Sequence, residues 1–156
     1  MKLLFICTHN RCRSIIAEAV TNQYGQGALE ARSAGSQPSG QVHPLSIKYL
    51  QQAAIDTSGL QSQSWDEHEA WQPDAVITVC DQAAAEHCPL WFGNSLKAHW
   101  GLADPSRLDG NEEELACAFK QTISTLRVRI ETLLSSNLQS MDNAKRLALL
   151  NALGTD

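Results

Sequence analysis

The sequence predicts an α/β protein in which helices cover both faces of a parallel β-sheet. Short apolar segments that suit buried strands alternate along the chain with longer segments that suit amphipathic helices. The clearest of the strands contains the run Ala75-Val76-Ile77-Thr78-Val79, which is typical of a strand buried on both faces. A chain of 156 residues is long enough to enclose such a sheet within one domain.

Each element of this alternation has a local signal. The pattern predicts strands at 3–6, 28–34, 74–80 and 96–100, and helices at 14–24, 44–54, 64–71 and 111–135. Gly25 and Gly27 end the first helix, Pro44 suits the first turn of the second, and acidic side chains open the last. The side chains expected to face inward from the first two helices are Ile15, Ile16, Ala19, Val20, Leu45, Tyr49, Leu50 and Ala53.

Residues 137–156 are expected to form a C-terminal helical extension of a main domain that occupies residues 1–136. Residues 141–153 can form an amphipathic helix, with Leu147, Leu150 and Leu153 on one side and Gly154 as its cap. Two placements are open, because this helix can fold back on the domain or contact a second subunit. The expected state is therefore a monomer or a weak dimer.

Composition and charge limit the classes of function. The chain is 43% hydrophobic and 19% charged, as in an ordinary soluble globular protein, and its net charge of −5 gives no general affinity for nucleic acid or anionic membranes. No apolar stretch reaches membrane length, so we expect a cytoplasmic protein whose five cysteines stay reduced. No Cys-x-x-Cys pair suggests a zinc site, and chemistry explains several of these cysteines better than structure does.

The loop at residues 7–13 carries the strongest functional signal. It follows the first strand, precedes the first helix, and has Cys7 and Arg13 at its two ends. Five intervening residues can curl their backbone N–H groups around one tetrahedral oxyanion, toward which the helix directs its positive end. Arg13 can fork onto two oxygens of that anion, and Cys7 is the expected nucleophile because the same cradle favours a thiolate. The expected substrate-binding residues are Thr8, His9, Asn10, Arg11, Cys12, Arg13 and Ser14.

Individual side chains near this loop have expected roles. Ser14 can donate a hydrogen bond to the Cys7 thiolate, and Asn10 can tie the loop backbone together. Cys12 is expected to point away, as a spare thiol or a protective partner. Glu18 can bond the loop or lie on a solvated helix face, and Cys117, in the apolar stripe of the last helix, is expected in the core.

Four short motifs stand at intervals along the chain. They are Cys7-Thr8-His9-Asn10-Arg11-Cys12-Arg13-Ser14 followed by Ala17-Glu18-Ala19, then Ser33-Ala34-Gly35, then Val79-Cys80, and then His99-Trp100-Gly101 through Asp104-Pro105. Together they resemble the low-molecular-weight tyrosine phosphatase family and the arsenate reductases built on its fold, over about residues 1–134. The resemblance implies strand order 2-1-3-4, with the site at the carboxyl ends of the central strands.

Asp104 is the expected general acid. An attack by Cys7 on phosphate or arsenate needs a proton for the departing oxygen, and an aspartate on a loop can supply it. Most Asp-Pro pairs are only turns, but this one follows His99-Trp100-Gly101 as it does in the family. Phosphatases of the family carry an aromatic residue after this pair, whereas Ser106 stands here, which weakens the phosphatase interpretation.

Cys80 and Cys88 discriminate between the two branches of the family. A phosphatase needs neither thiol, whereas reduction of arsenate needs thiols that supply two electrons. The resemblance implies a relay in which Cys7 binds arsenate, Cys80 attacks Cys7 to release arsenite, and Cys88 then pairs with Cys80. Ala83-Ala84-Ala85 predicts a short helix between these cysteines that would have to unwind. The alternative is that both are simply buried thiols.

The favoured function is thiol-dependent arsenate reduction, with thioredoxin or glutathione and glutaredoxin as the external reductant and no bound cofactor. The alternatives are a phosphotyrosine phosphatase that uses the same Cys7, Arg13 and Asp104, and an oxyanion-binding or redox-sensing module without turnover. Some reductases of this kind bind potassium through an acidic residue near Ser62, where this chain has Gln63. No metal site is therefore expected.

Overall fold

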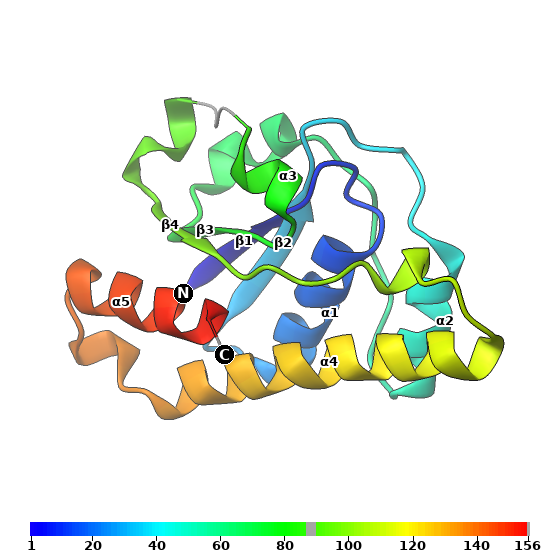
Figure 1. Cartoon of the computed structure of the whole chain (residues 1–156). Helices are drawn as coiled ribbons and strands as arrows, with labels where there is room; N and C mark the ends of the chain where they lie inside the picture. Colours follow the sequence, from blue (N-terminus) through cyan, green and yellow to red (C-terminus); the bar gives the residue numbers. More distant parts are fainter. Residues whose placement is uncertain (87–89, 156) are drawn as a thin grey trace.

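The computed structural model describes residues 1–86 and 90–155. Its centre is a parallel sheet of four strands, whose spatial order is β2-β1-β3-β4 (Figure 1). The strands are β1 (Lys2–Ile6), β2 (Glu30–Ala34), β3 (Ala75–Thr78) and β4 (Leu96–His99). The predicted fold class and strand order are confirmed.

The helices alternate with these strands. The α-helices are α1 (Arg13–Tyr24), α2 (Pro44–Gln52), α3 (Asp81–Ala84), α4 (Glu112–Ser135) and α5 (Asn143–Gly154), and the 3-10 helices are η1 (Trp65–Trp71), η2 (Leu90–Asn94), η3 (Pro105–Arg107) and η4 (Leu138–Ser140). The segment expected as a helix at 64–71 is thus a 3-10 helix. The sequence pattern gave no indication of η2, η3 and η4, because turns of three to five residues are too short to show a helical period.

Different elements cover the two faces of the sheet. Helix α1 packs against β1, β2 and α4, so α1 and α4 form the layer below the sheet in Figure 1. On the other face lies η1, where the guanidinium carbon of Arg32 stands 4.6 Å from the ring centre of Trp71. The two central strands, β1 and β3, are mostly apolar, and Leu3, Leu4 and Phe5 have no exposed surface. This burial explains why β1 and β3 lack the alternation of a half-exposed strand.

Two predicted core positions are wrong. Ala53 is exposed because α2 already ends at Gln52, which leaves Ala53 as the C-cap rather than part of the buried side. Cys117 is exposed as well. The buried stripe of α4 begins at Phe119, and two residues correspond to more than half a turn, so Cys117 lies on the opposite side of the helix.

Helix α5 packs against β4 at the edge of the sheet. Leu150 and Leu153 are buried there, and the indole N–H of Trp100 donates to the Leu150 carbonyl oxygen at 2.7 Å. A Cβ at Gly154 would clash with the His99 carbonyl oxygen, which shows how closely the helix approaches the end of β4. The extension therefore folds back on its own chain, while the division of the domains at residue 136 stays a prediction.

The helices within residues 1–86 and 90–155 give no indication of insertion into a membrane. None of these helices combines the length and the apolar character needed to cross a bilayer.

Candidate active site

The 7–13 loop lies at the carboxyl end of β1, between β1 and α1 (Figure 1). Segment 37–43 holds it from outside. The carbonyl oxygens of Thr8, His9 and Arg11 accept hydrogen bonds from the backbone N–H groups of Gln37, Ser39 and His43, at 2.9, 3.0 and 2.8 Å. A Cβ at Gly35 would clash with the carbonyl oxygens of Cys7 and Thr8, so only glycine permits this approach of β2 to the loop.

The backbone N–H groups of the loop are not engaged in the way that its carbonyl oxygens are. Among the described residues, no backbone carbonyl accepts a hydrogen bond from the N–H groups of residues 8 to 12. Buried N–H groups need an acceptor, and a ring of them at a helix N-terminus suits an anion. The loop therefore has the geometry of an oxyanion cradle.

Asn10 and Ser14 connect this cradle to Cys7. The Asn10 side-chain oxygen accepts from the Gln63 backbone N–H at 2.8 Å, and its Nδ2 donates to Ser14 Oγ at 2.8 Å. Asn10 has a φ of 45°, a left-handed conformation that asparagine tolerates better than most residues. Ser14 Oγ lies 2.9 Å from Cys7 Sγ. Because Ser14 accepts its hydrogen bond from Asn10, its own hydrogen is free to point at a Cys7 thiolate.

Arg13 joins the cradle to the loop that follows β4. Its Nη1 donates to the Leu102 carbonyl oxygen at 3.0 Å, and its Nη2 lies 3.7 Å from Asp104 Oδ2. Its buried Nε has no partner among the described residues. An anion seated in the cradle could accept from that Nε, which fits the clamp expected of Arg13.

Asp104 lies beside the cradle in a strongly polar environment. Burial alone would raise the pKa of its carboxyl, but hydrogen bonds from Ser106 and the charges of Arg13 and Arg107 outweigh burial and lower it. In this structure Asp104 is therefore a carboxylate. A bound dianion would draw away the charge of Arg13 and bring the Asp104 carboxyl closer to the protonated form that a general acid requires.

Cys12 is buried, and burial raises the pKa of its thiol to about 12 despite hydrogen bonds from Ser46 and Ser106. It is therefore a protonated thiol at neutral pH, unsuited to act as a nucleophile. It also lines the small hollow of about 40 Å³ that Cys7 and Arg13 line.

Cys80 lines the same hollow, which places a second thiol beside the cradle. It is the N-cap of α3, where its Sγ accepts from the Ala83 N–H at 3.4 Å and lies 3.9 Å from Thr8 Oγ1. The helix predicted around Ala83 to Ala85 is α3, which ends at Ala84. Cys88 lies outside the described residues.

Some predicted site residues lie at the rim. Arg11 is exposed and contributes its backbone, while His9 Nδ1 lies 3.0 Å from the Gln37 carbonyl oxygen. Three residues absent from the predicted set lie at the site, namely Gln82, Glu86 and Arg107. Arg107, three residues after Asp104, could have been found from its sequence position as a cation beside the acid. Glu86 could not, because its partner Thr8 is 78 residues away.

Glu18 lies behind the cradle, and its partner is on β2 rather than in the loop. Ser33 Oγ donates to Glu18 Oε1 at 2.7 Å, and burial raises the pKa of this carboxyl to about 7. The described part of the chain contains no group of three or more His, Cys, Asp or Glu side chains arranged to hold a metal ion. Phe92 is buried and packs against Trp65, with ring centres 5.7 Å apart.

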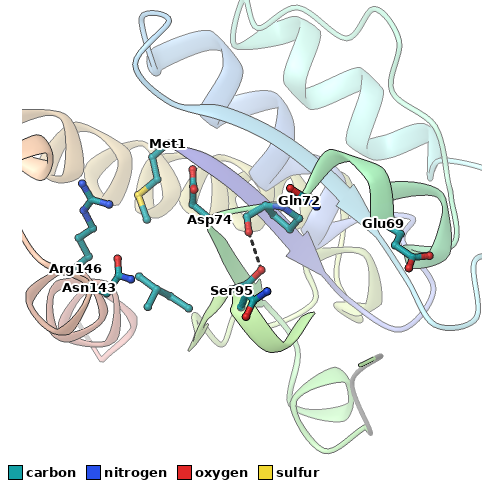
Figure 2. A pocket seen from close by; sticks show the side chains of 10 residues that line it. Met1, Glu69, Gln72, Asp74, Ser95, Asn143 and Arg146 are labelled. Atoms are coloured by element: carbon teal, nitrogen blue, oxygen red, sulfur yellow. Dashed lines mark hydrogen bonds between the residues drawn. The ribbon is translucent and has the colours of Figure 1, made fainter. Parts of the chain in front are cut away.

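A larger hollow of about 440 Å³ lies at the opposite edge of the sheet (Figure 2). Met1, Asp74 and Ser95, the residues that precede β1, β3 and β4, contribute to its lining together with Asn143 and Arg146 of α5. Its lining contains no cysteine or histidine, whereas Cys7, Cys12 and Cys80 line the small hollow at the carboxyl edge.

The geometry of the loop, Arg13 and Asp104 is that of a cysteine-based enzyme acting on a tetrahedral oxyanion. Residues 2–146 match the family model described as low molecular weight phosphotyrosine protein phosphatase. The chain belongs to this family, as its motifs suggested.

Its similar relatives carry a more specific name. It is 33% identical over 130 residues to an arsenate reductase of Halalkalibacterium halodurans, across 83% of this chain and 92% of that one. It is 31% identical to a glutaredoxin arsenate reductase of Synechocystis, across 86% and 96% of the two chains. A solved arsenate reductase in the phosphate binding state is 29% identical and superimposes with a TM-score of 0.68, over 86% of this chain and 96% of that one.

Proposed function

We propose that this chain is an arsenate reductase that uses Cys7 as its nucleophile and Cys80 as its second thiol. The observation that carries the proposal is the position of Cys80, which lines the same small hollow as Cys7 and Arg13. Hydrolysis of a phosphate ester does not use a second thiol at this position, whereas reduction of arsenate requires one. The names of the relatives point to the same activity.

In the first step the Cys7 thiolate attacks arsenate and forms a sulfur–arsenic bond. One arsenic–oxygen bond breaks, and the oxygen leaves as water after accepting a proton from Asp104. The cradle N–H groups and Arg13 stabilise the negative charge of the remaining oxygens. Arsenic stays pentavalent in this step.

Reduction occurs when the Cys80 thiolate attacks Cys7 Sγ. A Cys7–Cys80 disulfide forms, the sulfur–arsenic bond breaks, and its electron pair stays on arsenic, which leaves as trivalent arsenite. The Cys88 thiolate then attacks Cys80 and releases Cys7 as a thiolate. An external dithiol, of thioredoxin or of a glutaredoxin system, reduces the Cys80–Cys88 disulfide and supplies the two electrons.

The second candidate is hydrolysis of phosphate monoesters through a Cys7 phosphocysteine. The complete set of Cys7, Arg13 and Asp104 supports it, because this set would serve a phosphate ester equally well. The two candidates separate on Cys80, which hydrolysis does not use.

The test measures arsenite production by the reduced protein with thioredoxin and, separately, with glutathione and glutaredoxin, alongside hydrolysis of p-nitrophenyl phosphate. Wild type is compared with Cys80→Ser, Cys88→Ser and the control Cys117→Ser, whose exposed thiol lies on α4. We expect Cys80→Ser and Cys88→Ser to lose arsenite turnover and keep hydrolysis, while Cys117→Ser keeps both. Brisk hydrolysis in every variant without arsenite from wild type would instead identify a phosphatase.

A further inference from the structure

The hydroxyl of Thr8 lies between two side chains of the segment that follows β3. Thr8 Oγ1 donates to Glu86 Oε1 at 2.8 Å and lies 3.9 Å from Cys80 Sγ. Cys80 is buried and stands at the start of α3, whereas Glu86 is half-buried and follows its end. One hydroxyl of the phosphate loop (residues 7–13) thus contacts both ends of what we call the relay segment, residues 80–86.

A threonine hydroxyl has a single hydrogen. While that hydrogen points at Glu86, a hydrogen bond between Thr8 Oγ1 and Cys80 Sγ can form only with a neutral Cys80 thiol as the donor. A Cys80 thiolate has no hydrogen to donate, so Thr8 would have to turn its hydrogen toward the sulfur. Glu86 and the Cys80 thiolate therefore compete for the same donor.

We propose that Glu86 is a positioning residue, which holds Thr8 turned away from Cys80 and so keeps the second thiol protonated and the relay segment closed until Cys80 is needed. When Thr8 turns to a Cys80 thiolate, its bond to Glu86 is lost and the far end of the relay segment is released. Activation of the thiol and opening of the segment become one event. This role rests on the proposed function, since only a relay needs Cys80 to wait.

Few other polar contacts attach the relay segment to the rest of the chain. The bond between Glu86 and Thr8 therefore contributes a substantial part of that attachment. Helix α3 has only four residues, and Asp81, Gln82 and Ala84 are exposed. At its start Asp81 Oδ1 lies 3.0 Å from His99 Nε2, with 97% of the Asp81 side chain exposed. An exposed pair of this kind contributes little, so the partly buried bond between Glu86 and Thr8 is the firmer of the two.

Other titratable and charged groups face the hollow beside Cys80 and have to stay constant in a test. Glu86 and the Asp81–His99 pair belong to the relay segment and to β4. The titratable and charged groups that line the hollow beside Cys80 are Cys7, His9, Arg11, Cys12 and Arg13 from the phosphate loop, and Asp104 and Arg107 from the loop after β4. None of them is altered in the variants compared below.

The experiment follows alkylation of Cys80 by iodoacetamide in the reduced full chain, without arsenate or reductase partners. Initial rates at Cys80 are read from pH 6 to 10 by tandem mass spectrometry, with the exposed Cys117 thiol as internal reference. We expect Glu86→Ala to raise the rate at neutral pH roughly tenfold, as loss of a hydrogen bond to a charged acceptor predicts, and to move the pH midpoint lower. Glu86→Gln, which keeps an acceptor oxygen, should lie between Glu86→Ala and wild type.

The variant Thr8→Val distinguishes a Glu86 that positions the Thr8 hydroxyl from a Glu86 that only attaches the relay segment. It also frees the relay segment, but it removes the donor for the Cys80 thiolate, so its pH midpoint should move higher than that of wild type. Glu113→Ala, an exposed glutamate on α4, is the matched control and should change nothing.

Two results would overturn the proposal. The first is a Glu86→Ala chain that matches wild type in rate and midpoint, and the second is a midpoint that moves in the same direction in Glu86→Ala and Thr8→Val. Because no arsenate is present, this outcome does not depend on whether the chain produces arsenite. Arsenite production by wild type is measured separately and tests the proposed function alone.

Discussion

The phosphate loop and the relay segment meet at one edge of the sheet and are held by different means. Backbone hydrogen bonds from segment 37–43 fix the loop, and the buried side chains of Asn10 and Ser14 stabilise it further through a hydrogen bond to each other. The relay segment contains a four-residue helix with three exposed side chains, and it is attached through polar side-chain contacts of Cys80, Asp81 and Glu86. The part that would bind the anion is preorganised, whereas the part that would have to move is lightly attached.

The largest expected effect comes from the phosphate loop. Cys7→Ser should lower both arsenite production and p-nitrophenyl phosphate hydrolysis by at least roughly 10³-fold, because a serine hydroxyl is not ionised at neutral pH. Steady-state assays of both activities measure this, and circular dichroism checks the fold. A variant that kept either activity would show that Cys7 is not the shared nucleophile.

A smaller effect is expected in the support behind the loop, at Glu18. Burial raises its pKa from 4.5 to about 7, so between these values the folded chain binds more protons than the unfolded chain. The free energy of unfolding contributed by Glu18 therefore falls as pH rises through this window. Glu18→Gln cannot titrate, and it should gain about 3 kcal/mol relative to wild type between pH 4.5 and pH 8.

Urea unfolding at these two pH values measures that gain. Glu113→Gln, on the exposed start of α4, is the control and should follow wild type at both. An equal difference between Glu18→Gln and wild type at both pH values would mean that the Glu18 carboxyl titrates normally in the folded chain.

The smallest effect is expected in the relay segment. Asp81→Asn weakens the pair with His99, yet the exposure of Asp81 predicts no measurable change in the free energy of unfolding. Amide hydrogen exchange in residues 81–86 should become roughly two- to threefold faster, because one of these polar contacts is loosened. If Asp81→Asn instead destabilised the whole chain, the relay segment would belong to the cooperative core and the contrast with the phosphate loop would fail.

Local patterns were sufficient to predict the strands and the phosphate loop. The apolar run at 75–79 indicates a strand buried on both faces, and the spacing of Cys7 and Arg13 indicates an anion cradle. The pairing of β1 with both β2 and β3 came from the family resemblance, because parallel neighbours lie far apart in sequence.

The remaining features depend on tertiary contacts. The hydrogen bond between Thr8 and Glu86 joins residues 78 positions apart, and no local sequence pattern predicts it. Cys117 fits an apolar stripe by composition, but it lies on the side of α4 opposite the buried Phe119 and is exposed. Likewise, the half-buried Glu18 of α1 has its hydrogen-bond partner, Ser33, on β2, 15 residues away in the sequence.

The most direct test of the account is a single turnover without an external reductant. The reduced chain, with its five thiols, is mixed with excess arsenate, and arsenite and remaining thiols are counted. We expect one arsenite per chain and the loss of two thiols, with peptide mapping that locates the disulfide between Cys80 and Cys88. A chain that keeps all five thiols and forms no arsenite, yet hydrolyses p-nitrophenyl phosphate, would contradict the relay and establish a phosphatase.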